Sequence, residues 1–197
     1  MAAAVAGGAD RDAGRAADEI ARRRGDLLGA MLAEGGKILT EGDPEVSEAI
    51  DFCRFYALAA EELAACPGLT TRPRGVAAVV SPWNFPLAIP CGGVAAALAA
   101  GNNVILKPAS DTAYIAWLLC ECFWEAGVPA SALQFLPCPG GVEGMQLVTH
   151  GGVDAVILTG GTETALEMLR AKPTLHLLAE TGGKNATIVT ALSDRDL

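Results

Sequence analysis

The chain has 197 residues, 51% of them hydrophobic, and a formal net charge of −9. Its length suits one domain or slightly more and allows a sizeable core. The acidic balance argues against a nucleic-acid-binding surface, which needs clustered Lys and Arg. The longest apolar stretch, residues 87–100, is too short for a membrane span and is interrupted by Pro90, Gly92 and Gly93. We therefore expect a protein that contacts neither nucleic acid nor a membrane.

The cysteines point to a reducing compartment. A chain of this size needs no disulfides to fold, and its cysteines lie mostly inside apolar segments, so we expect free thiols and a cytoplasmic protein. The first residues, Met1 to Ala6, lack the basic region of a secretory signal. Two cysteines that are two apart on a helix point in different directions, which argues against a metal site. The six cysteines are Cys53, Cys66, Cys91, Cys120, Cys122 and Cys138.

Two helices are predicted in an N-terminal helical region over residues 1–70. An apolar rhythm from residue 13 to residue 34 predicts the first, which the Gly35-Gly36 pair would end. Pro44 opens the second, and a Cys-Pro-Gly sequence at 66–68 would end it. The short basic run Arg22–Arg24 lies in the first helix, where we expect a solvated face.

From Gly75 onward, short apolar runs alternate with helical patterns. This alternation predicts βαβ units, and therefore an α/β domain over residues 71–197 with a parallel sheet covered by helices on both faces. Strands are expected at 76–80, 103–106, 133–136, 155–158 and 175–179, with a further short one at 186–189. Helices are expected between them at about 87–100, 112–126, 142–149 and 162–170.

Two polar side chains follow predicted strands, at the edge where parallel sheets bind ligands. Asn84 lies in the proline-bracketed turn Ser81–Pro86, and its carboxamide is a neutral donor suited to an oxygen that becomes negative during a reaction. It could instead simply form the turn. Glu180 closes an apolar strand, where partial burial would raise its pKa toward the range of a general base. The alternative is a carboxylate that caps nearby backbone.

The same edge carries features suited to phosphate and ribose. Lys107 ends a predicted strand and could hydrogen-bond a ribose or a phosphate, although a solvated strand end is the alternative. The sequence from Leu158 to Glu163 predicts a strand, a glycine turn and a helix start. Free N–H groups at a helix N-terminus suit a pyrophosphate, and the alternative is an ordinary tight turn with Thr162 as the N-cap.

Several of these segments together resemble the aldehyde dehydrogenase superfamily. The most diagnostic are Ser81–Pro86, Lys107–Thr112 and Glu180–Asn185. The helix sequence Asp43–Cys53 and the residue Thr181 narrow the likeness to the 1-pyrroline-5-carboxylate (glutamate semialdehyde) dehydrogenases, including the domain fused to proline dehydrogenase in bifunctional bacterial proteins. The resemblance implies a Rossmann-variant dinucleotide-binding domain in residues 71–197.

The resemblance implies NAD(P)-dependent oxidation of L-glutamate 5-semialdehyde to glutamate. Asn84 would supply an oxyanion donor, and Glu180 would activate the water that hydrolyses a thioester. The partners implied are a small aldehyde substrate and, for the complete enzyme, further copies of itself in a homo-oligomer. The residues expected to bind the cofactor are Ser81, Pro82, Trp83, Lys107, Ser110, Gly140, Gly160, Gly161, Thr181 and Gly182.

The expected cofactor is NAD, with NADP possible. The family often has Glu where this chain has Ser110, and Glu would accept the ribose hydroxyls and repel a 2′-phosphate. Ser110 removes that repulsion. Two further departures from the family pattern are Leu158 and Gly161, and Gly161 lacks a hydroxyl that could hold phosphate.

The reaction of this family needs a Cys thiolate that attacks the aldehyde. In the family this cysteine follows the position of Glu180 by a few tens of residues, and none of the six cysteines here takes that place. We therefore expect the chain to be an N-terminal fragment without its catalytic domain, and inactive alone. The alternatives are an aldehyde dehydrogenase with another substrate and a non-catalytic nucleotide-binding module.

Overall fold

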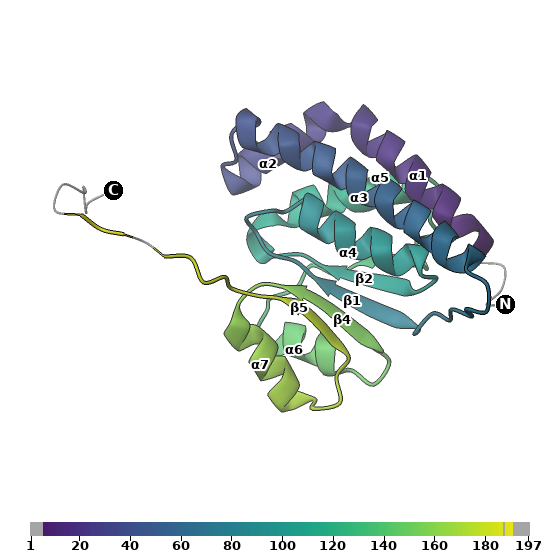
Figure 1. Ribbon diagram of the computed structural model, residues 1–197. Helices are drawn as coiled ribbons and strands as arrows, with labels where there is room; N and C mark the ends of the chain where they lie inside the picture. The colour runs from purple at the N-terminus through teal and green to yellow at the C-terminus, as the bar shows by residue number, and fades with distance from the viewer. Residues whose placement is uncertain (1–5, 187, 191–197) are drawn as a thin grey trace.

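The structure is a computed structural model that describes residues 6–186 and 188–190. Its centre is a five-stranded parallel sheet in the order β3-β2-β1-β4-β5 (Figure 1). The strands are short and rich in Val, Leu, Ile and Ala, which suits a sheet covered on both faces. They are β1 (Val76–Val80), β2 (Asn103–Lys107), β3 (Leu133–Phe135), β4 (Ala155–Thr159) and β5 (Leu177–Glu180).

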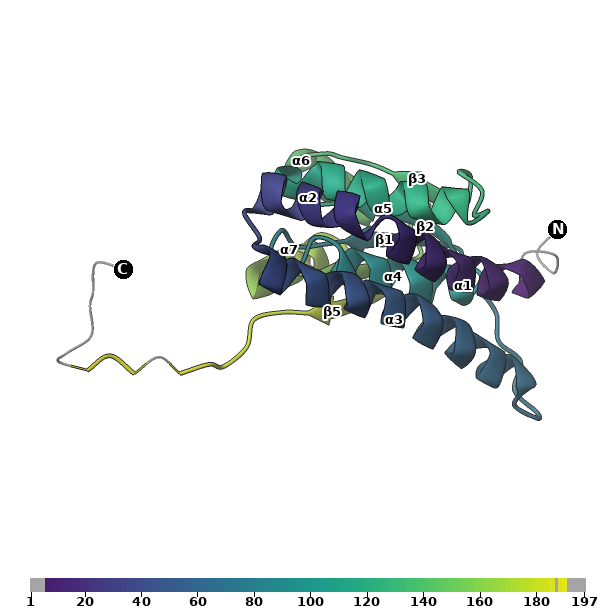
Figure 2. The ribbon, with the colours of Figure 1, turned by 90° about the horizontal axis from the view of Figure 1, so that it is seen from above.

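Helices cover both faces of the sheet, and one face carries a second layer (Figures 1 and 2). The first face is covered by α4 (Ala88–Ala99) and α5 (Ala113–Glu125), which a 3₁₀ turn, η2 (Ser110–Thr112), precedes. The other face is covered by α6 (Val142–Thr149) and α7 (Thr162–Ala171). The second layer packs on α4 and α5 and consists of α1 (Ala6–Arg22), α2 (Arg24–Gly35) and α3 (Leu39–Ala65). The α/β fold predicted from the sequence is therefore confirmed.

The N-terminal helices differ from the sequence prediction in two respects. The helix expected over 13–34 is two helices, α1 and α2, which part at Arg23. The second helix begins at Leu39 instead of Pro44, and Pro44 lies inside it. Pro44 is the sixth residue of this helix, beyond the first turn whose N–H groups lack intrahelical partners, so it removes one backbone hydrogen bond there.

The basic run is also more than a solvated face. Arg22 pairs with Glu19 at 2.7 Å and with Glu125 of α5 at 2.8 Å. Arg23 reaches Glu121 at 2.9 Å, and only 19% of its side chain is exposed. The run therefore joins the second layer to α5, through residues about a hundred positions away in the sequence.

The five main strands lie where they were predicted, within one or two residues at each end. The sixth, expected at 186–189, is not found: residues 186, 188 and 189 are not in a strand, and residue 187 lies outside the described residues. The chain leaves the body after β5 in an extended course (Figure 1). No helix in the described part of the chain is long and apolar enough to cross a membrane.

Two glycines allow α4 to lie close to its neighbours. A Cβ on Gly93 would come within 2.9 Å of Val79 Cγ1 in β1, and a Cβ on Gly92 would meet the Phe52 ring of α3 at 3.2 Å. Both distances are shorter than ordinary contacts. The Gly92-Gly93 pair therefore fixes how closely sheet, α4 and α3 are stacked.

Candidate functional site

The turns with the predicted site residues lie along one edge of the sheet. Strand register places Val80 beside Lys107 and Leu158, and Thr159 beside Glu180. Two backbone hydrogen bonds join the turns at this edge: Ser81 N–H donates to the Lys107 carbonyl at 3.2 Å, and Gly160 N–H donates to the Glu180 carbonyl at 3.1 Å. The strand order reverses between β1 and β4, which is where open α/β sheets bind their ligands.

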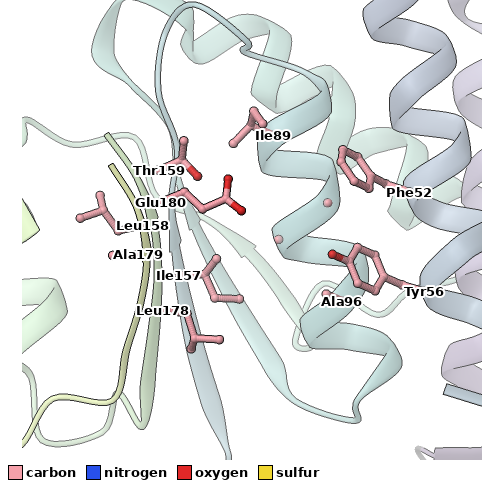
Figure 3. Close-up of a pocket in the computed structure, with 12 residues that line it drawn as sticks. Phe52, Tyr56, Ile89, Ala96, Ile157, Leu158, Thr159, Leu178, Ala179 and Glu180 are labelled. Carbon is pink, nitrogen blue, oxygen red and sulfur yellow. The ribbon is translucent and has the colours of Figure 1, made fainter. Parts of the chain in front are cut away.

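Glu180 lines a cavity of about 390 Å³ between the sheet and the α3–α4 pair. Figure 3 shows its carboxylate turned away from the strand, toward the side of Ile89 and Phe52. Glu180 is exposed, so the partial burial considered from the sequence is not found. The cavity is otherwise largely apolar, with walls from Phe52, Tyr56, Ile89, Gly92, Gly93, Ala96, Ile157, Leu158, Thr159, Leu178 and Ala179.

Asn84 lines a different cavity, of about 210 Å³, with Trp83, Pro86, Lys37 and the end of α2. Asn84 is exposed, and Trp83 is 59% exposed. Asn84 and Glu180 thus lie at the same edge of the sheet and line two different cavities.

Beneath the Asn84 turn lies a buried ion pair that sequence reasoning missed. Glu45 of α3 is 2% exposed and pairs with Lys37. Its other oxygen accepts hydrogen bonds from the N–H groups of Leu87 and Ala88, at 2.8 and 3.0 Å. The signal was present in the sequence, since Glu45 lies on the apolar face of its helix, one helical turn from Ala49.

Lys107 is buried, with 5% of its surface exposed, so the solvated strand end considered for it is not what the structure has. Its ammonium donates to the Pro108 carbonyl at 2.9 Å. Its side chain passes under α6, where a Cβ on Gly144 would meet Lys107 Cε at 3.4 Å. In the described part of the chain no other partner is found for this ammonium, which has two further N–H donors.

Ser110 lines a third cavity, of about 280 Å³, with residues 108, 109, 113 and 137–139. The cavity lies between the turn after β2 and the loop after β3. Gly140 follows this loop and is exposed, and a Cβ there would meet no atom within 4 Å. Gly140 therefore has no packing requirement of its own.

The glycine turn after β4 begins α7, with Gly161 as an N-cap that offers no side-chain hydrogen bond. Added Cβ atoms on Gly160 and Gly161 would make only ordinary contacts, at 3.6 Å. Thr181 and Gly182 follow β5 and are exposed, and a Cβ on Gly182 would lie 3.8 Å from Thr162 Oγ1. Gly182 thus lies beside the N-terminus of α7.

The cysteines have no disulfide partners, and four of them are buried. Burial raises the pKa of Cys120 to about 12 and that of Cys122 to about 11. A hydrogen bond with Cys53, together with burial, raises the pKa of the Cys91 thiol well above its usual value. At neutral pH these three side chains are protonated thiols, which are poor nucleophiles.

Comparison with known proteins identifies the family. The aldehyde dehydrogenase family profile matches residues 13–197. A 1-pyrroline-5-carboxylate dehydrogenase of a Geobacillus species is 36% identical over 201 aligned positions, which cover 93% of this chain and 39% of that protein.

Solved structures agree. Proline utilization A (PutA) from Corynebacterium freiburgense superimposes with a TM-score of 0.86 at 44% identity, over 89% of this chain and 18% of that one. A Thermus 1-pyrroline-5-carboxylate dehydrogenase with bound NAD gives a TM-score of 0.81 at 34% identity, over 89% of this chain and 38% of that one. The chain thus spans well under half the length of these relatives. With the family profile matched over nearly its whole length, this chain belongs to the aldehyde dehydrogenase family.

Proposed function

We propose that this chain is the cofactor-binding part of a 1-pyrroline-5-carboxylate dehydrogenase, which oxidises L-glutamate 5-semialdehyde to glutamate with NAD. The named relatives support the substrate, and the Thermus structure with bound NAD supports the cofactor. The observation that carries the proposal is the buried Lys107 ammonium at the carboxyl edge of the sheet. A buried ammonium with spare donors is costly unless a ligand uses them.

The residues at this edge fit a dinucleotide. Lys107 would donate to ribose hydroxyls, and the cavity lined by Ser110 would take the adenosine end. The N-terminus of α7, which has no side-chain cap, would face the pyrophosphate. Gly140, Gly160, Gly161 and Gly182 leave the backbone accessible there. The buried Ser81, the half-buried Pro82 and the exposed Trp83 and Thr181 border the same edge.

When bound, the nicotinamide would accept a hydride from the aldehyde carbon. The contribution of the chain is to hold the oxygens. Asn84 would donate a hydrogen bond to the aldehyde oxygen as it becomes negative, and loss of such a donor costs about 10²–10³ in rate. The reaction also needs a Cys thiolate, which would add to the aldehyde carbon so that hydride loss leaves a thioester. Glu180 would take a proton from the water that attacks the thioester carbon, and the C–S bond would break to release the thiol. Aldehyde and water thereby become a carboxylate, the hydride passes to the cofactor, and the protons pass through Glu180 to solvent.

The test is a calorimetric titration of the chain with NAD. Wild type should bind, and Lys107→Met should weaken binding by about 10–100-fold, since a hydrogen bond to a charged group contributes about 1.5–3 kcal/mol. The same substitution should leave the unfolding free energy equal or slightly higher, because it removes a buried charge. Lys172→Met is the matched control: Lys172 donates to two carbonyls at the opposite edge of the sheet, and its loss should not change NAD affinity.

The substrate is tested by turnover. The complete reading frame that contains this sequence should reduce NAD with 1-pyrroline-5-carboxylate more efficiently than with simple aliphatic aldehydes. Preference for another aldehyde would overturn the proposed substrate. Failure of the wild-type chain to bind NAD would overturn the cofactor role.

A further inference from the structure

We propose that Lys37 and Glu45 are positioning residues for Asn84: together they hold the backbone from which the Asn84 carboxamide projects. The inference rests on the proposed role of Asn84 as an oxyanion donor. It concerns the geometry of the turn, which can be measured without turnover or cofactor.

The first contact is on Asn84 itself. Lys37 Nζ donates to the Asn84 carbonyl oxygen at 3.0 Å. This carbonyl belongs to the peptide group between Asn84 and Phe85, so the hydrogen bond fixes the orientation of that plane. The Asn84 side chain is exposed at this point and faces the cavity beside the turn.

Two further contacts hold the residues that follow. The Lys37 ammonium lies 3.8 Å from the centroid of the Phe85 ring, a cation–π contact. Glu45 Oε1 accepts the N–H groups of Leu87 and Ala88, which begin α4 and have no side-chain cap from their own segment. Backbone or ring atoms of four residues within 84–88 are therefore held by one ion pair.

The ion pair is itself fixed from two directions. Lys37 follows Gly36, which ends α2 with a left-handed φ of 63°, and the N–H groups of both residues bond to carbonyls of α2 at 3.1 and 3.2 Å. Glu45 lies on α3, with 1% of its side chain exposed, and the Lys37 side chain is 11% exposed.

The energetics favour a geometric role over a stabilising one. A buried ion pair contributes little net stability compared with a well-packed apolar pair, because both charges lose their hydration. Its benefit here is directional, since it gives hydrogen bonds to one carbonyl and two N–H groups at fixed places. An apolar pair would fill the space without orienting the turn.

The test is an NMR measurement on one peptide group. Asn84-Phe85 is the only Asn-Phe pair in the sequence. A chain labelled with ¹³C-carbonyl Asn and ¹⁵N Phe therefore gives a single cross-peak, from the peptide that Lys37 holds. In wild type, the Phe85 N–H should show an order parameter of about 0.8 or above, as in rigid backbone.

Two variants remove the ammonium. Lys37→Met leaves the Glu45 carboxylate buried without its cation and is the variant at risk of unfolding. The double variant Lys37→Met with Glu45→Gln removes both charges and keeps an oxygen for Leu87 and Ala88, so it should fold. In either, the Asn84 carbonyl signal should move upfield and the Phe85 order parameter should fall below about 0.6. Lys37→Arg, which keeps a charged donor, should restore most of both.

Lys172→Met is the control, since it also removes a lysine that binds two backbone carbonyls. It should leave the Asn84-Phe85 peak unchanged, although it should lower the global stability about as much as the loss of the Lys37 ammonium does. The proposal is overturned by a mobile Phe85 N–H in wild type, by an unchanged peak in a folded variant lacking the ammonium, or by an equal change in Lys172→Met. A chain that shows the expected peaks and does not bind NAD would leave the inference standing and refute the proposed function.

Discussion

The two faces of the sheet are built differently. The face under α4 and α5 carries a second helical layer and shares with it one continuous core, which includes Ile20, Met31 and Phe123. The face under α6 and α7 has a single layer of short helices and a much smaller core around Val156 and Met168. The thick face holds the turn that carries Asn84, whereas the thin face provides the glycine turn proposed to hold phosphate. In the proposed function, the turn that positions Asn84 and the turn that exposes its backbone to phosphate therefore lie on opposite faces of one sheet.

Carboxylates in the second layer cap both helices of the thick face. Glu45 binds the first N–H groups of α4, and Glu34 of α2 accepts from Tyr114 and Ile115 N–H at 2.9 and 2.8 Å at the start of α5. Neither helix has a side-chain cap of its own. The orientation of α4 and α5 therefore depends on the layer above them.

The largest expected effect comes from breaking the buried cap. Glu45→Ala should lower the unfolding free energy by about 3–5 kcal/mol, because it strands the Lys37 cation and two N–H groups. Glu34→Ala should cost only about 1–2 kcal/mol, the scale of a lost helix cap, since it strands no buried cation. Urea denaturation measures both, and an equal cost would contradict the distinction drawn between the two carboxylates.

A matched pair of methionines compares the two cores. Met31→Ala in α2 and Met168→Ala in α7 remove the same side chain from a helix, at positions 0% and 4% exposed. Such truncations cost about 2–5 kcal/mol, depending on how far the site can collapse. We expect Met31→Ala near the upper end and Met168→Ala near the lower end, because a single layer of short helices can shift into the gap. The reverse order in denaturant titrations would show that the thin face is the more rigid one.

The choice between NAD and NADP should depend on Ser110, which lies where the loops of the two faces meet. Ser110→Glu should weaken NADP binding by at least about tenfold relative to NAD, or about 1.4 kcal/mol, through repulsion of the 2′-phosphate. Ser110→Gln is the control, of similar size and without charge. If both substitutions change the NADP to NAD ratio equally, charge is not the cause.

The last expected effect is confined to high pH and is a loss of stability from the thick face. Cys120 and Cys122 have folded pKa values of about 12 and 11, above the ordinary value of 9.0. A raised folded pKa stabilises the protein fully below the unfolded pKa, and this contribution is lost as the pH rises above about 9. Each thiol contributes a slope of at most about 1.4 kcal/mol per pH unit there. Cys122→Ala should therefore flatten the fall of stability between about pH 9 and 11.

Sequence reasoning found the strands and the edge where their turns meet. The hydrophobic periodicity and the Gly and Pro residues that end helices and strands are local signals. It placed β1 within its true bounds and located Asn84, Lys107 and Glu180 at strand ends. It missed the Glu45 cap, whose partners Leu87 and Ala88 lie more than forty positions away. It also took Arg23 for a solvated residue, because Glu121 comes next to it only through the packing of α1 on α5. The sequence shows that Glu45 lies on an apolar helix face, but it does not show which groups Glu45 or Arg23 binds, because those contacts are set by tertiary structure.

The long helix α3 has a mechanical consequence. Its first turns bear Glu45, under the Asn84 turn. Two and three turns later, Phe52 and Tyr56 form a wall of the Glu180 cavity. With a rise of 1.5 Å per residue, Glu45 and Phe52 lie about 10 Å apart along one continuous rod. The same helix therefore supports the Asn84 turn and forms a wall of the Glu180 cavity. A displacement of α3 would move both supports at once.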